Sequence, residues 1–304
     1  MRNKIFISAY LFLAAITIII GYFSFLGNNY YSLGNLDESI YNSVFFSVVL
    51  IVACVALRLL KITHQYFKAF FFLEVFFLVV FSIAYIQNLV WFNHYFTVSD
   101  RKEEIKNQVL PILSSGPRIF SEYDLYVKSR ISTYEVALSS AYKNKAAFPL
   151  EYNKYNFDPS MDLSENINYK RAVLDARISL KNDSISDQNL AWYKEAINSL
   201  ENWKSISVVK NLIVLEQKIN SDIEHLNNLS HYRTHNENAS DFNYDIHIPD
   251  VRFQFNSLGE IKIFPFLLFT ILHTMSLMIY LFAKRNSRSP FRLKNILKPR
   301  KTIR

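Results

Sequence analysis

Four polar side chains that interrupt long apolar runs are the residues best placed to do chemistry. They are Glu74, Gln87, Asn88 and His273. Ionisable groups inside a membrane are costly and often carry protons or ions. Glu74, however, lies one to two turns from Lys68, so it can pair with Lys68 or with Arg58. The other three side chains can hydrogen-bond to neighbouring helices. We therefore favour helix packing over a proton or ion path.

Sequence signatures of catalysis and metal binding are weak. The five glycines are too scattered to build a dinucleotide or phosphate loop, and no nucleophile elbow or HExxH motif occurs. His231 and His235 are four residues apart, but no cysteine lies near them. Residues 158–165 alternate oxygen side chains, but they lack the glycine and distal glutamate of a calcium loop. We predict a non-enzyme with no catalytic residue, no metal site and no cofactor.

The apolar runs predict four membrane-spanning helices. About 20 apolar residues are needed to cross the hydrocarbon core. Charge-free windows of that length are rich in Phe, Leu, Ile and Val. The predicted spans are 5–26, 42–60, 69–92 and 264–283, within segments 1–92 and 263–283.

The distribution of basic residues predicts the topology. Lys and Arg occur before the first span, between the second and third, and throughout the tail 284–304, whereas segment 93–262 is slightly acidic. Because basic short loops stay on the cytoplasmic side, we expect both termini to be cytoplasmic and residues 93–262 to lie outside. The single cysteine, Cys54, falls inside a span, so the outer segment cannot form an intrachain disulfide. This favours a bacterial inner membrane.

Segment 93–262 shows mostly helical periodicity. An apolar stripe at steps of three and four predicts a helix over 118–145, and Ser114-Ser115-Gly116-Pro117 predicts a break before it. Further helices are expected over 169–182 and from residue 187 to 226. The latter is either one long helix or two with a bend near Ser205. These narrow stripes indicate an antiparallel bundle or a coiled coil.

The end of that segment departs from the helical pattern. Residues 231–241 are polar, which predicts a mobile link. Phe242, Tyr244, Ile246 and Ile248 then alternate with polar residues, as in a strand. The fold class predicted is an all-α membrane protein with a mainly helical extracytoplasmic domain and a small β element at 242–255.

The basic tail is a candidate contact for anionic lipids or for a cytoplasmic partner. Its candidate residues are Arg285, Arg288, Arg292, Lys294, Lys298, Arg300 and Lys301. Although the net charge is +8, the excess of basic groups lies beside the predicted spans and in the tail, and not in segment 93–262, which argues against nucleic acid as a partner.

These features predict a non-enzymatic component of a cell-envelope assembly, acting as scaffold or sensor. Its expected partners are other membrane or envelope proteins, or further copies of the chain. The alternative is an oligomeric channel or transporter subunit that uses Glu74 and His273.

Overall fold

A computed structural model describes residues 2–62 and 67–283. The chain divides into two compact units. One comprises Met1–Lys102 with Arg252–Arg304, and we call it the membrane unit. The other, Glu103–Val251, is called the helical lobe. The seven candidate residues of the basic tail lie outside the described residues.

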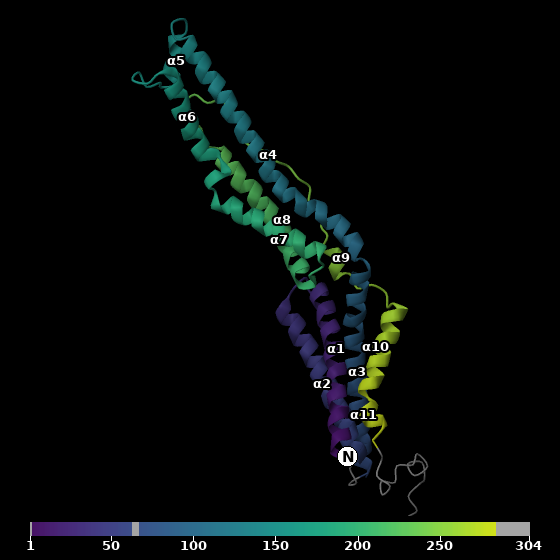
Figure 1. Ribbon diagram of the computed structural model, residues 1–304. Coiled ribbons are helices and arrows are strands. Elements are labelled where there is room, and N and C mark those ends of the chain that lie inside the picture. Colours follow the sequence, from purple (N-terminus) through teal and green to yellow (C-terminus); the bar gives the residue numbers. More distant parts are fainter. Residues whose placement is uncertain (1, 63–66, 284–304) are drawn as a thin grey trace, which may run out of the picture. The chain divides into compact units, whose positions relative to one another are not determined.

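The membrane unit is built from apolar helices. They are α1 (Arg2–Tyr31), α2 (Leu36–Ile62), α3 (Phe67–Asp100), α9 (Phe253–Asn256), α10 (Ile263–Ser276) and α11 (Met278–Leu281). α1, α2 and α3 pack against one another, and α10 packs on α1 and α3 (Figure 1). Three segments are long and apolar enough to cross a membrane: Ser8–Tyr31, Leu36–Ile62 and Phe72–Asp100. The chain is therefore a multi-pass membrane protein.

The predicted fourth span is shorter in the structure than the sequence suggested. α10 has 14 residues, which rise about 21 Å and fall short of the hydrocarbon thickness of roughly 30 Å. It ends at Ser276, and the four-residue α11 begins two residues later at Met278. The Lys61 ammonium donates to the carbonyls of Tyr280 and Leu281 at 2.8 and 3.1 Å, which satisfies the C-terminal end of α11. The fourth span remains a prediction.

Small residues set the distance between α1 and its neighbours. A Cβ on Gly27 would lie 1.8 Å from the Trp91 carbonyl oxygen of α3, so the two backbones approach as closely as a glycine allows.

The outward faces of the membrane-unit helices carry exposed apolar side chains, such as Phe72 and Phe76, as expected for helices in contact with lipid.

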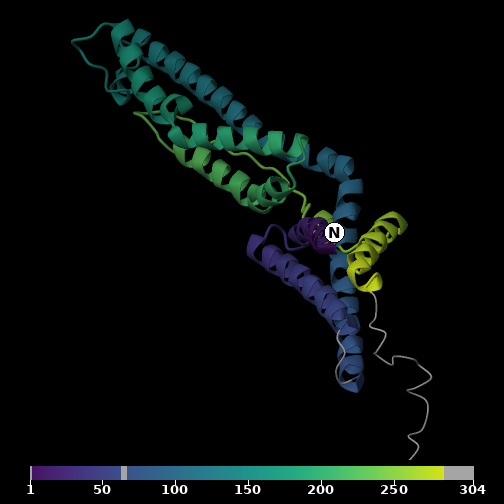
Figure 2. The ribbon, with the colours of Figure 1, turned by 60° about the horizontal axis from the view of Figure 1, so that its bottom comes forward.

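The helical lobe consists of helices and irregular segments. The helices are α4 (Lys102–Lys143), α5 (Pro149–Lys154), α6 (Leu163–Ile178), the 3₁₀ turn η1 (Leu180–Asn182), α7 (Ser184–Glu201) and α8 (Ser205–Ser230). α7 and α8 lie side by side, and α5 lies at the end of the lobe where α4 finishes (Figures 1 and 2). Residues 202–204 separate α7 from α8, so the alternative with two helices is correct.

The predicted break at 114–117 is wrong, because α4 continues through it. Pro117 removes one backbone donor, yet the neighbouring turn is supported: Ser115 Oγ donates to the Ile112 carbonyl at 2.6 Å. The buried ring of Tyr193 from α7 covers Gly116 so closely that a Cβ there would lie 2.3 Å from ring atoms. Packing against α7 thus overrides the local helix-breaking signal.

The predicted β element at 242–255 is also wrong, since no strand occurs among residues 2–62 and 67–283. Residues 242–250 have no regular secondary structure, and α9 begins at Phe253. The alternation itself is present: Phe242 is buried and Asn243 is exposed. The alternating pattern indicated that side chains such as Phe242 are buried, but the surface that buries Phe242 is a helix and not a neighbouring strand. Its ring packs on Tyr123 and Tyr126 of α4 at centroid distances of 5.1 and 5.6 Å.

Candidate functional site

A buried arginine organises the middle of the helical lobe. Arg130 lies on α4, three residues after Val127 and four before Tyr134, so it shares the face that these buried residues occupy. Only 5% of Arg130 is exposed, and side chains of this type are seldom buried unless they are paired.

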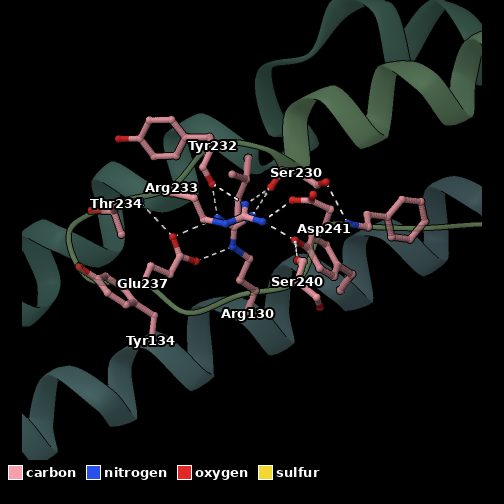
Figure 3. Close-up of polar contacts among 12 residues, drawn as sticks. Arg130, Tyr134, Ser230, Tyr232, Arg233, Thr234, Glu237, Ser240 and Asp241 are labelled. Atoms are coloured by element: carbon pink, nitrogen blue, oxygen red, sulfur yellow. Dashed lines mark hydrogen bonds and ion pairs between the residues drawn. The ribbon is translucent and has the colours of Figure 1, made fainter.

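Every N–H group of Arg130 has an acceptor (Figure 3). Nε and Nη2 donate to the two carboxylate oxygens of Glu237 at 2.5 and 3.0 Å. Nη1 donates to the Ser230 carbonyl at 2.7 Å and to the Tyr126 hydroxyl at 3.0 Å, and Nη2 also donates to the Tyr232 carbonyl. Burial lowers the pKa of Arg130, but the hydrogen bond and the charge of Glu237 outweigh that effect and raise it. The guanidinium is therefore a permanently charged anchor.

The anchor holds the chain that leaves α8. Glu237 also accepts from the Thr234 backbone N–H at 3.1 Å, and Arg233 donates to Asp241. The Phe242 backbone N–H donates to Ser230 Oγ at 2.9 Å. We call residues 230–241 the anchored loop. The sequence predicted a mobile link here because its polar residues resemble solvated chain, but several of them bond to one another and to α4.

A cavity of about 450 Å³ lies between α4 and the anchored loop. Its lining residues are Tyr126, Ser129, Arg130, Thr133, Tyr134, Ala137, Tyr155, Asn236, Glu237, Asn238, Ala239 and Ser240. Since Arg130 and Glu237 neutralise each other, the remaining walls offer neutral hydroxyls, amides and tyrosine rings. A second cavity, of about 710 Å³, is formed by residues 156–173 and 232–235 and contains Lys170, whose pKa is lowered by burial.

A second buried polar cluster joins α7 to α8. Asp222 is fully buried and accepts from Tyr193 at 2.7 Å and from Asn189 at 2.5 Å. Burial raises the pKa of Asp222, and the hydrogen bonds from Tyr193 and Asn189 only partly offset the rise. Burial, and then the carboxylate of Asp222, also raise the pKa of Tyr193. The cluster fixes the two helices in register.

Asp183 caps α7 and connects it to α8. Its carboxylate accepts from the Ile185 backbone N–H at 3.2 Å, from Ser186 Oγ at 2.5 Å and from His225 Nε2 at 2.6 Å. Burial acts to raise the pKa of Asp183, but the bonds from Ser186 and His225 outweigh it, so the pKa is lowered.

The low pKa of Asp183 predicts a specific acid sensitivity. Its contribution to stability is fully present above the unfolded-state pKa of about 3.9 and is lost as the pH falls through the lower folded-state pKa. Asn can still cap the helix, but it lacks the charge that strengthens the bonds from Ser186 and His225. We therefore expect Asp183→Asn to reduce the free energy of unfolding at neutral pH by about 1–2 kcal/mol and to make stability fall less steeply with decreasing pH. Thermal unfolding of the detergent-solubilised chain between about pH 3 and pH 7 measures both effects.

Asp187 provides the control for this experiment. It is an exposed acid in the same first turn of α7, so Asp187→Asn should change stability by less than about 1 kcal/mol. If the stability of Asp183→Asn fell with decreasing pH as steeply as that of the wild type, the role given to Asp183 would be contradicted.

The polar residues singled out inside the spans do not form one site. Glu74 is buried and accepts from the Tyr280 hydroxyl at 2.5 Å. His273 lies against Phe81 and Tyr85 at ring distances of 4.2 and 4.9 Å, about two helical turns along α3 from Glu74.

The ring nitrogens of His273 make no hydrogen bond of good geometry within the described residues, although the backbone of Phe81 is close enough to interact. Asn88 donates to the Ala84 carbonyl of its own helix at 2.9 Å, and Gln87 is exposed on the outside of α3. The expected pairing of Glu74 with Lys68 involves a side chain outside the described residues.

Sequence reasoning missed Arg130 and Glu237. The available signal was an arginine on the apolar face of the helix predicted over 118–145. No sequence pattern connects it to Glu237, which lies 107 residues further along the chain.

Fold and site together define a class: a multi-pass membrane protein with a helical lobe in which a buried arginine is paired with a glutamate of the same lobe. Comparison with family models, with curated proteins and with solved structures finds no match to this chain.

Proposed function

We propose that the chain is a non-enzymatic component of a cell-envelope assembly, with the helical lobe acting as scaffold or sensor on the outer side of the inner membrane. The observation that carries the proposal is that every N–H group of Arg130 donates to an acceptor within the lobe. A guanidinium with five protein acceptors has no N–H left for a substrate, so its role is to hold the anchored loop against α4.

The shape of α4 supports a scaffold. Its 42 residues correspond to about 63 Å of helix, and the anchored loop ties the chain leaving α8 back to its middle. A braced rod of this length suits the presentation of contact surfaces at a distance. A sensor would use the same construction, with a ligand in the 450 Å³ cavity changing the position of the anchored loop.

Purification of the full chain in mild detergent tests the proposal. We expect stoichiometric membrane or envelope partners, or several copies of the chain, in native mass spectrometry. Arg130→Met should release these partners, whereas Lys128→Met, at an exposed position of the same helix, should retain them. Isolation of a lone monomer from native membranes would count against an assembly.

Topology is tested separately. Protease added to intact spheroplasts should digest the lobe and leave the C-terminus intact. A clipped tail with an intact lobe would invert the proposed orientation.

The alternative function, a channel or transporter subunit, depends on Glu74 and His273. The hydrogen bond from Tyr280 to Glu74 and the aromatic surroundings of His273 support a packing role instead. Flux through reconstituted chain that is abolished by Glu74→Gln would favour the alternative.

A further inference from the structure

The turn between α4 and α5 exposes apolar side chains at the end of the helical lobe. Phe148 is 61% exposed and Leu150 is 78% exposed, and Ala146 and Ala147 beside them are exposed too. We call residues 143–150 the lobe tip. Apolar side chains of this size gain free energy on burial, so several exposed ones within a few residues of one another mark a contact surface.

The lobe tip is ordered by its own contacts. The backbone N–H groups of Ala147 and Phe148 donate to the Asn144 carbonyl at 3.1 and 2.9 Å. Beneath it, the rings of Tyr142 and Tyr152 pack on Phe157 at 5.5 and 4.9 Å. Backbone hydrogen bonds and packed rings thus order the two ends of the turn that carries Phe148.

The charge of the lobe tip is opposite to that of the lobe. Residues 103–251 carry 16 basic and 21 acidic groups, a net charge of −5. No acid occurs between Glu135 and Glu151, whereas Lys143 and Lys145 both fall in that interval and are exposed. Glu151 is itself paired with Lys154 at 2.5 Å. The tip is thus a basic spot on an acidic body.

We propose that the lobe tip docks onto an anionic lipid bilayer. Phe148 and Leu150 enter the boundary between headgroups and acyl chains, while Lys143 and Lys145 contact lipid phosphates. Side chains of both kinds are needed at such an interface. A soluble polyanion would use the lysines but would leave both apolar side chains in water, and a purely apolar groove would not need the lysines. This inference goes beyond the proposed function, and it stands whether or not a protein partner is found.

The experiment uses the full chain in nanodiscs of zwitterionic lipid, with an environment-sensitive fluorophore attached through Ala147→Cys. Cys54 is buried in the membrane unit, and Cys54→Ala removes it as a second labelling site. Vesicles containing phosphatidylglycerol are added, and the blue shift of the probe is titrated. We expect a saturable shift with these vesicles and none with zwitterionic vesicles.

Two variants of the lobe tip test separately the contributions of its basic and of its apolar side chains to vesicle binding. Lys143→Gln with Lys145→Gln should weaken vesicle binding about 25-fold, because each basic group near an anionic surface contributes about a factor of five. Phe148→Ser with Leu150→Ser should weaken it at least about tenfold. Circular dichroism should show that both variants remain folded, since all four side chains are exposed.

Matched controls separate the tip from the rest of the lobe. Val136→Ser alters an apolar side chain of similar exposure, 66%, and Lys204→Gln with Lys210→Gln removes two exposed lysines elsewhere. Both should bind vesicles as the parent chain does. Absence of a shift, an equal shift with zwitterionic vesicles, or an equal shift with inorganic polyphosphate would overturn the proposal.

Discussion

Arg130→Met should lower the free energy of unfolding of the helical lobe by about 3–5 kcal/mol, the usual cost of removing one partner of a buried ion pair. The substitution leaves the Glu237 carboxylate buried without its counter-ion, and it also removes the hydrogen bonds from Arg130 to the Ser230 and Tyr232 carbonyls. Chemical unfolding of the detergent-solubilised chain measures the loss. Hydrogen exchange should additionally show faster exchange in the anchored loop.

An exposed ion pair on the same helix supplies the control. Arg118 pairs with Glu122 at 2.8 Å, but 72% of the Arg118 side chain is exposed. Arg118→Met should therefore cost no more than about 1 kcal/mol. If Arg130→Met were as mild as Arg118→Met, the anchor would not stabilise the lobe.

A double-mutant cycle isolates the pair itself. Glu237→Gln alone should destabilise the lobe, and combining it with Arg130→Met should cost less than the sum of the two single changes. The double variant should remain less stable than the wild type, because the hydrogen bonds from Arg130 to the Ser230 and Tyr232 carbonyls are still missing.

Gly27→Ala should destabilise the membrane unit by about 3 kcal/mol, the upper end of the usual cost of overpacking. The added Cβ would lie 1.8 Å from the Trp91 carbonyl oxygen and 2.7 Å from its carbonyl carbon. A backbone cannot rotate away as a side chain can, so α1 and α3 must separate. Titration with sodium dodecyl sulphate, monitored by tryptophan fluorescence, measures the loss.

Gly21 lies on the same helix and provides a matched comparison. A Cβ there would meet the Ser47 hydroxyl oxygen at 2.6 Å, and this oxygen can rotate to another position. Gly21→Ala should therefore cost under about 1 kcal/mol. Equal effects of the two substitutions would show that helix propensity, and not the close approach of α1 to α3, governs stability.

The sequence alone determined the membrane character and the helical class. Runs of about 20 apolar residues have few alternatives to a membrane-spanning helix, because an unpaired backbone in lipid is too costly. Three of the predicted spans overlap helices that are long and apolar enough to cross a membrane, and α4 contains the helix predicted over 118–145 as far as Lys143. Periodicity of this kind is local, so it can be recognised without knowing the partner surface.

Only the tertiary structure decided which surfaces pack on those segments and which residues pair with their charged side chains. Gly116-Pro117 reads as a helix break until Tyr193 covers it, and residues 242–250 read as a strand until α4 proves to be the surface beneath Phe242. The pairing of Arg130 with Glu237 likewise depends on two segments 107 residues apart. The local sequence shows which side chains must be buried or paired with an opposite charge. The tertiary structure decides which residues bury them and which residues carry the opposite charge.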